Sequence, residues 1–358
     1  MNDVRFGVIG LHNHYHAYPI GDYLHRGIKG AQLVAVADER EHLARSFAES
    51  YGASTWTTDY NEIFERDDID AVVITSYTSA HADHVEAAAR AGKHVLLDKP
   101  IATTLADARR IVEAGKEVKV MLAYLLRFIP AYRRAYEVVA SGGVGDLVSA
   151  FYSIRIPATF ITDAPDVTEQ GWYGDPVKAG GGGFLDHGVH FTDFFRWFFQ
   201  ADATSVVART GNLTYKNLGV EDYGIATYTL DSGAIVTVES SWHAADWYGP
   251  LASPDRCTLT GTRGEIELHY QKSPQIEIAS LDEPYRGRVY LDWEGEERYE
   301  SCYRNILEEF VACIQEDRPP VPDATDGAKA LEMILGAYEA DRANQAVTFP
   351  FEAVAINA

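Results

Sequence analysis

The chain has 358 residues, 46% hydrophobic and 23% charged, which is enough for two globular domains with separate cores. Its formal net charge of -22 argues against nucleic acid and anionic membranes as partners. The three cysteines form no C-x-x-C pair, which favours a reduced, cytoplasmic setting, and we expect no leader segment. No apolar run approaches the ~20 residues that span a bilayer.

The first third of the chain alternates β-rich runs with helical patterns. The runs are apolar throughout, which is typical of parallel strands covered by helices on both faces. This pattern predicts a doubly wound parallel α/β domain of the Rossmann type over residues 1–123. The predicted strands are residues 4–10, 31–38, 69–76, 93–100 and 118–124, and the predicted helices are residues 13–28, 41–52, 81–92 and 104–115.

From residue 124 onward, alternating runs are joined by connections of hairpin length, such as LDSG and GTRG. They predict an α+β domain over residues 124–358 with a large, mostly antiparallel sheet. Helices are expected around residues 130–141, after the glycine-rich residues 178–183, and near residues 301–316 and 323–343.

The turn after the first strand departs from a dinucleotide-binding pattern. Gly10 occupies the first glycine position of G-x-G-x-x-G, but His12 and Tyr15 occupy the other two. We expect Gly10 to keep the tight turn, and His12, Asn13 and His14 to present their backbone to a pyrophosphate at the helix start. His12, His14 and His16 alternate, but no carboxylate or thiolate adjoins them in sequence, so we expect no metal site.

Asp38 ends the second strand, where a carboxylate can accept hydrogen bonds from an adenosine ribose. This position favours NAD over NADP, since a 2′-phosphate would be repelled, although the neighbouring Arg40 leaves NADP as an alternative. The structural alternative for Asp38 is a helix cap.

Two further segments carry groups that can handle a proton. Lys99 lies at the end of the predicted strand 93–100, on the same sheet edge as Gly10, where an ammonium can lower a hydroxyl pKa. After the glycines at 180–183, which allow close approach to a ligand, Asp186 and His190 share one helix face. The histidine can take a proton from a hydroxyl, and the aspartate can orient it or bind a sugar hydroxyl. The alternatives are an exposed lysine and a structural histidine.

Together these segments resemble the glucose–fructose oxidoreductase / inositol dehydrogenase / MocA family over nearly the whole chain. The resemblance rests, in order, on VRFGVIG, AGKHVLLDKP, LLRFIPAYRRAYEVVASGGVGDL and GWYGDPVKAGGGGFLDHGVHFTDFFRWF. Asp98 stands where the family usually has glutamate. The resemblance implies an NAD(P)-dependent oxidoreductase acting on a sugar, polyol or similar compound, with Lys99 and His190 beside the nicotinamide and the reacting carbon.

The site residues expected on these grounds fall into three groups. The catalytic residues are Lys99, Asp186 and His190. The cofactor contacts are Gly10, His12, Asn13, His14, Asp38, Arg40, Thr75, Ser76, His81, Asp98 and Lys99. The substrate contacts are Tyr124, Arg127, Trp172, Tyr173, Asp186 and His190, and we expect the second domain to bind substrate and join subunits.

Two other functions stay open. One is a redox-neutral enzyme that uses bound NAD to cleave a glycoside or eliminate a group. The other is a non-catalytic ligand-binding protein, which the altered turn at His12 and Tyr15 favours.

Assembly is indicated by one predicted strand. Its two alternating sets, residues 225, 227 and 229 and residues 226, 228 and 230, both contain apolar or aromatic side chains. Helices cover one face of such a sheet, so we expect the other face to pair subunits in a homodimer or homotetramer, as the resemblance also implies. A solvated face is the alternative.

Overall fold

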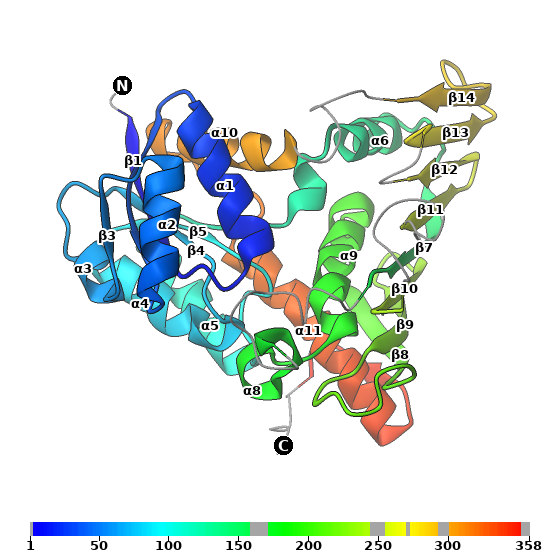
Figure 1. The fold of residues 1–358 in the computed structure, drawn as a ribbon. Coiled ribbons are helices and arrows are strands. Elements are labelled where there is room, and N and C mark those ends of the chain that lie inside the picture. Colours follow the sequence, from blue (N-terminus) through cyan, green and yellow to red (C-terminus); the bar gives the residue numbers. More distant parts are fainter. Residues whose placement is uncertain (1–2, 158–170, 244–254, 270–272, 293–300, 352–358) are drawn as a thin grey trace. The chain divides into compact units, whose positions relative to one another are not determined.

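The computed structural model describes residues 3–157, 171–243, 255–269, 273–292 and 301–351. The chain divides into two compact units (Figure 1). Unit 1 comprises Met1–Phe128 and Glu300–Ala328, and unit 2 comprises Ile129–Tyr299 and Lys329–Ala358. Among the helices of the described ranges, none is long and apolar enough to cross a membrane.

Unit 1 is built on a six-stranded, fully parallel sheet with strand order β3-β2-β1-β4-β5-β6. The central strands β1 and β4 are almost entirely buried, because α1 packs with α2 and α10 while α4 packs with α3 and α5. This confirms the doubly wound parallel sheet expected from the sequence. The strands are β1 Val4–Ile9, β2 Ala31–Ala37, β3 Thr55–Thr57, β4 Ala71–Ile74, β5 His94–Leu97 and β6 Val120–Leu122. The helices are α1 His14–Arg26, α2 Glu41–Tyr51, α3 Tyr60–Phe64, α4 His81–Arg90, α5 Leu105–Ala114 and α10 Ser301–Gln315.

Two elements of unit 1 have no counterpart in the sequence patterns. The edge strand β3 is only three residues long, and of these only Thr57 is buried. No hydrophobic run marks so short a strand, and the following helix α3 is a single short turn-like element. The other strands are shorter than the apolar runs that predict them, because those runs continue into the buried turns at the strand ends.

The sequence-based division at residue 123 differs from the division of the structure at two segments. The first is residues 124–128, which belong to unit 1. The second is Glu300–Ala328, which contains α10 and also belongs to unit 1. The apolar side of α10 is buried, and its Phe310 ring lies 6.2 Å from the ring of Phe6 in β1. The apolar periodicity of α10 shows that one face is buried, but it does not say against which sheet.

Unit 2 contains a nine-stranded sheet with order β14-β13-β12-β11-β7-β10-β9-β8-β15. It is antiparallel except where β10 pairs with β7, which confirms the mostly antiparallel sheet expected. The strands are β7 Leu147–Arg155, β8 Ala203–Gly211, β9 Tyr223–Leu230, β10 Ile235–Ser241, β11 Arg256–Gly261, β12 Gly264–Leu268, β13 Ile276–Ser280, β14 Gly287–Leu291 and β15 Val347–Thr348. The helices are α6 Pro130–Ala140, α8 Pro176–Ala179, α9 Gly183–Phe199 and α11 Ala324–Ala343, the last of which begins in unit 1.

One face of this sheet is covered by helices. Ala226, Tyr228 and Leu230 of β9 are buried, while Thr229, from the other alternating set, is exposed. Helix α9 contacts β7, β9 and β10, and Tyr228 donates a hydrogen bond to the Met333 carbonyl of α11 at 3.1 Å. One face of β9 is therefore buried and the other is more exposed, as the alternation of its residues predicts.

The glycines before α9 accommodate the protein's own atoms. A Cβ on Gly182 would overlap the Glu221 carbonyl oxygen, and a Cβ on Gly181 would overlap the Tyr338 hydroxyl. The sequence interpretation, that these glycines allow a ligand to approach, is therefore not needed to explain them. Gly182 is required because α9 starts against the segment that leads into β9, and Gly181 because the Tyr338 side chain of α11 lies against it.

Replacing Gly182 with alanine should reduce the free energy of unfolding by about 1–3 kcal/mol, the usual cost of overpacking a core. The matched control is Gly211→Ala in β8, where a Cβ would meet no atom within 4 Å, and its effect should stay within about 0.5 kcal/mol. Denaturant unfolding of both variants measures this. Equal unfolding midpoints would contradict the packing argument.

Candidate functional site

The turn after β1 is built around Gly10, whose φ of +74° lies in the left-handed region. Its N–H donates to the Ala37 carbonyl at 2.8 Å, and Thr75 Oγ1 donates to its carbonyl at 2.5 Å. A Cβ on Gly10 would lie 2.8 Å from the Cα of Ser76. Glycine is therefore required here, as the sequence predicts.

Helix α1 starts directly after this turn. Its first turn contains no acidic residue, and Asn13 makes no side-chain cap to the helix amides. A helix N-terminus at the carboxyl end of a parallel strand favours phosphate, through its free amides and its partial positive charge. The first turn of α1 therefore has the features that favour an anion, and dinucleotide binding at this turn stays a prediction.

The three alternating histidines point to different partners. His12 Nε2 lies 2.8 Å from Glu39 Oε1, and its ring lies against Tyr77 with centroids 3.6 Å apart. The His14 ring lies beside Tyr15, and His16 contacts Asp98. They share no face because α1 begins at His14.

His12, Asp38 and Glu39 form a group whose potential ligand atoms lie within 4.8 Å of one another. The carboxylates come from the end of β2, which sequence adjacency could not indicate. Asp38 is fully buried, and its Oδ1 lies 2.7 Å from Arg40 Nε, so a cation would have to displace a guanidinium. This charge balance disfavours a metal at the group.

His81 holds two segments of the sheet edge together. It is 1% exposed, with Nδ1 2.9 Å from the Pro100 carbonyl and Nε2 3.2 Å from the Ser76 carbonyl. Burial lowers its pKa. His81 therefore holds the expected cofactor contact Ser76 through its backbone carbonyl, and both ring nitrogens face carbonyls of the protein.

Asp98 follows β5 and joins the turn to the segment of Lys99. Its Oδ1 lies 2.5 Å from His16 Nδ1 and accepts the Lys99 N–H at 2.7 Å, while Asn13 Nδ2 donates to its Oδ2 at 2.5 Å. Burial alone would raise the pKa of this carboxyl, but His16 and Lys99 lower it below its usual value. His16 is absent from the sequence-predicted site, because only the fold brings the first turn of α1 to β5.

In unit 2, three titratable side chains lie on the partly exposed side of α9: Asp186, His187 and His190. Asp186 Oδ2 is 3.1 Å from His187 Nδ1, and the His187 and His190 ring centroids are 6.5 Å apart. The sequence pairs Asp186 with His190 by helical spacing, and the structure adds His187 beside the carboxylate. The signal for His187 was its position directly after Asp186.

Glu221 fixes the start of α9. Its carboxylate accepts the N–H of Gly182 at 2.8 Å, the N–H of Phe184 at 3.0 Å and the hydroxyl of Tyr338 at 2.8 Å. Burial raises the pKa of Glu221. The helix that carries Asp186 and His190 is thus anchored at its N-terminus by a buried acid, which the sequence patterns did not indicate.

The expected substrate contacts are mostly buried. In unit 1, Tyr124 is fully buried, and Arg127 Nη2 lies 3.6 Å from Asp326 Oδ1. In unit 2, the Trp172 and Tyr173 rings stack with centroids 4.0 Å apart. Arg127, Trp172 and Tyr173 thus make contacts within their own units, and the part of all four residues in substrate binding stays a prediction.

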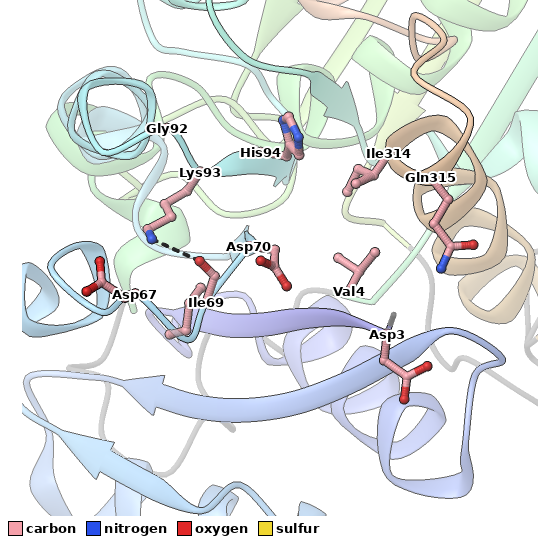
Figure 2. Close-up of a pocket in the computed structure, with 10 residues that line it drawn as sticks. All are labelled: Asp3, Val4, Asp67, Ile69, Asp70, Gly92, Lys93, His94, Ile314 and Gln315. Carbon is pink, nitrogen blue, oxygen red and sulfur yellow. Dashed lines mark hydrogen bonds between the residues drawn. The ribbon is translucent and has the colours of Figure 1, made fainter. Parts of the chain in front are cut away.

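A cavity of about 540 Å³ in unit 1 lies at the amino ends of the parallel strands, opposite the end that carries Gly10 (Figure 2). It is lined by residues at the starts of the strands, including Val4, Asp70 and His94, and Lys93 Nζ donates to the Ile69 carbonyl there at 2.9 Å. Parallel sheets bind ligands at the carboxyl ends of their strands, so this cavity is separate from the turn at Gly10.

Comparison with known proteins identifies the family. The model described as "Oxidoreductase family, NAD-binding Rossmann fold" matches residues 4–125, and the GFO/IDH/MocA C-terminal domain matches residues 132–267. The inositol 2-dehydrogenase of Rhizobium meliloti (strain 1021) is 31% identical over 92% of this chain and 94% of its own length. The chain belongs to the Gfo/Idh/MocA oxidoreductase family.

Two further proteins extend the comparison of this Gfo/Idh/MocA chain. The scyllo-inositol 2-dehydrogenase (NAD(+)) of Bacillus subtilis (strain 168) is 28% identical over 95% of each chain. An oxidoreductase domain protein from Kribbella flavida shares the fold with a TM-score of 0.86, at 22% identity, over 98% of this chain and 100% of the other. The family, the oxidoreductase class and the NAD-binding Rossmann domain expected from the sequence are thereby confirmed.

Replacing His16 with alanine should lower the free energy of unfolding by about 3–5 kcal/mol near neutral pH, because a buried carboxylate loses its partner. His16→Asn should lower the free energy of unfolding less than His16→Ala does, because the asparagine amide can replace the Nδ1–H donor. The folded-state pKa of Asp98 is lowered, so the pairing stabilises the fold above about pH 3.8 and is lost as the pH falls further. Denaturant unfolding near neutral pH and below pH 3.8 measures this. Equal losses of unfolding free energy for the two variants would contradict it.

Proposed function

We propose that this Gfo/Idh/MocA protein transfers a hydride between a secondary hydroxyl carbon of a sugar or cyclic polyol and NAD. The observation that supports this most is the alignment with an inositol 2-dehydrogenase over nearly the full length of both chains. NAD, when bound, accepts the hydride, and the protein must orient the substrate and remove the hydroxyl proton. Cys257, Cys302 and Cys313 are buried and form no disulfide, which supports a reducing, cytoplasmic location as part of this proposal.

Lys99 stabilises the oxygen of the reacting hydroxyl in this proposal. Its backbone N–H is fixed by Asp98 at 2.7 Å, and the Asp98 carboxylate is held in turn by His16 and Asn13. The ammonium therefore extends from an anchored segment. A positive charge beside a hydroxyl lowers the pKa of that hydroxyl and favours loss of its proton.

His190 receives the hydroxyl proton, and Lys99 is the alternative proton acceptor. Asp186 binds a second substrate hydroxyl or orients the neighbouring imidazole of His187, whose Nδ1 lies 3.1 Å away. Tyr124, Arg127, Trp172 and Tyr173 are proposed to shape the substrate site. Both His190 and Asp186 sit on α9, which the cap by Glu221 holds in place.

We further propose that the outer face of the unit 2 sheet, the side that α9 and α11 leave uncovered, pairs two copies of the chain. Cross-strand pairing connects Val207 to Thr227, Thr227 to Thr237 and Thr237 to Phe151 in one row. Val207 is 52% exposed and Phe151 36%, and Ile235 nearby is 53% exposed. A half-apolar sheet face of this kind is typical of a self-complementary two-fold interface.

Lys99→Ala and His190→Asn should each reduce turnover by roughly 10²–10⁴-fold, the usual contribution of general acid–base catalysis. The matched controls are Lys29→Ala and His42→Asn, both at exposed positions, and they should keep wild-type activity. NADH formation is followed with a panel of inositols and sugars at saturating NAD.

Full activity of His190→Asn on the best substrate would contradict its assigned role. Substrate turnover without net NADH formation would instead identify the redox-neutral alternative. No binding of NADH by the wild-type chain would identify the non-catalytic one.

Phe151→Lys should dissociate the assembly, because it places a charge in the centre of the outer face. Light scattering after size exclusion at micromolar concentration should give the wild type a mass of at least twice 39.6 kDa, and the variant a mass near 39.6 kDa. Leu281→Lys, at a residue 63% exposed just after β13, is the matched control and should keep the wild-type mass. A monomeric wild type would overturn the proposed assembly.

A further inference from the structure

Two carboxylates stand side by side after β2, at the edge where a Rossmann domain holds the adenosine ribose. The sequence position selects Asp38, because it directly ends the strand. A ribose diol needs free acceptor positions on a carboxylate, and an ionised carboxylate offers about four. The hydrogen bonds of Asp38 and Glu39 therefore decide which of the two can serve.

Asp38 has no acceptor position to spare. Its Oδ1 accepts the Arg40 N–H at 2.9 Å and Arg40 Nε at 2.7 Å. Its Oδ2 accepts the Leu11 N–H at 2.6 Å and Arg40 Nη2 at 2.9 Å. These four donors match the four positions, and the side chain is 0% exposed.

These bonds give Asp38 a different task. Leu11 follows Gly10 directly, so Asp38 ties the turn after β1 to the end of β2. Arg40 is committed to the same carboxylate through both its backbone and its guanidinium. A 2′-phosphate would have to compete with Asp38 for that guanidinium, which weakens the case for Arg40 as an NADP-binding residue.

Glu39 is placed and exposed in the way that a ribose acceptor requires. Its side chain is 46% exposed, and its Oε1 lies within 2.8 Å of His12 Nε2. Its Oε2 accepts the Tyr60 hydroxyl. One side-chain donor on each oxygen fixes the carboxylate and leaves acceptor positions toward solvent.

The partners of Glu39 are themselves held in place. The His12 ring lies against Tyr77, with centroids 3.6 Å apart, and the Tyr60 ring lies against His84, with centroids 4.9 Å apart. Partial burial acts to raise the pKa of Glu39, but the hydrogen bonds from His12 and Tyr60 lower it to about 2. The carboxylate is therefore ionised and preorganised at neutral pH. Its ligand atom also lies within 4.8 Å of the Asp38 carboxylate, in the same part of the sheet edge.

We propose that Glu39, positioned by His12 and Tyr60, accepts the adenosine ribose hydroxyls of the cofactor and excludes a 2′-phosphate, while Asp38 serves to hold the turn. This inference rests on the proposed use of NAD. It also explains His12, because the side chain that replaces the second motif glycine is the one that fixes Glu39. The altered turn then exchanges a glycine for a residue that orients the ribose-binding acid.

The test compares NADH and NADPH binding, by fluorescence titration with a chelator present, for the wild type and three variants. Glu39→Gln should weaken NADH binding about tenfold or more, because a charged acceptor is lost. It should also reduce the preference of the protein for NADH over NADPH. Glu41→Gln, an exposed acid two residues away, is the matched control and should bind as the wild type does. Asp38→Asn should lower the unfolding midpoint and leave the ratio of the two affinities close to that of the wild type.

The ratio of NADH to NADPH affinity is the deciding measurement, because a purely structural role of Glu39 would weaken both cofactors alike. An unchanged ratio in Glu39→Gln would overturn the inference and leave the proposed function standing. A changed ratio in Asp38→Asn with a wild-type unfolding midpoint would overturn it as well. A wild type that binds neither dinucleotide would overturn both the inference on Glu39 and the proposed function. NADH binding without turnover of any polyol would reject the proposed substrate class alone.

Discussion

Gly10 approaches Ser76 so closely that no side chain fits between them, and the arrangement of the carboxyl edge of unit 1 depends on this contact. Because β1, β4 and β5 are parallel, the segments that follow them emerge at the same edge of the sheet. Thr75 bonds to the Gly10 carbonyl, and the Asn13 N–H bonds back to the Thr75 carbonyl. The turn and the end of β4 are thereby locked together, and α1 starts in a fixed direction.

Carboxylates from two strands then hold the turn from opposite sides. Asp38 accepts the Leu11 N–H from the end of β2, and Asp98 contacts Asn13 and His16 from the end of β5. A buried carboxylate is costly unless its oxygens are hydrogen-bonded, and both of these are. At the two missing motif glycines, the His12 side chain is directed toward Glu39, whereas the Tyr15 side chain is 38% exposed.

In unit 2, a buried carboxylate likewise holds the start of a helix, α9. The buried carboxylate of Glu221 satisfies amides that a helix N-terminus leaves without partners, and Gly182 is needed because the Glu221 backbone lies so close. Asp186, His187 and His190 therefore project from a rigid helix. Catalytic groups on regular elements are held more accurately than groups on loops.

The sequence by itself determined the fold class of both units, the glycine at the tight turn, and the helix that carries Asp186 and His190. These features follow from local signals: hydrophobic periodicity, turn residues and helical spacing. Only the tertiary structure assigned α10 to unit 1, joined His16 to Asp98, and separated the roles of Asp38 and Glu39. His16 and Asp98 are 82 positions apart, and His12 and Glu39 are 27 apart. A local pattern shows that a face must be buried or a charge must be paired, but the partner is chosen by strand order and register, which bring distant segments to one edge of the sheet.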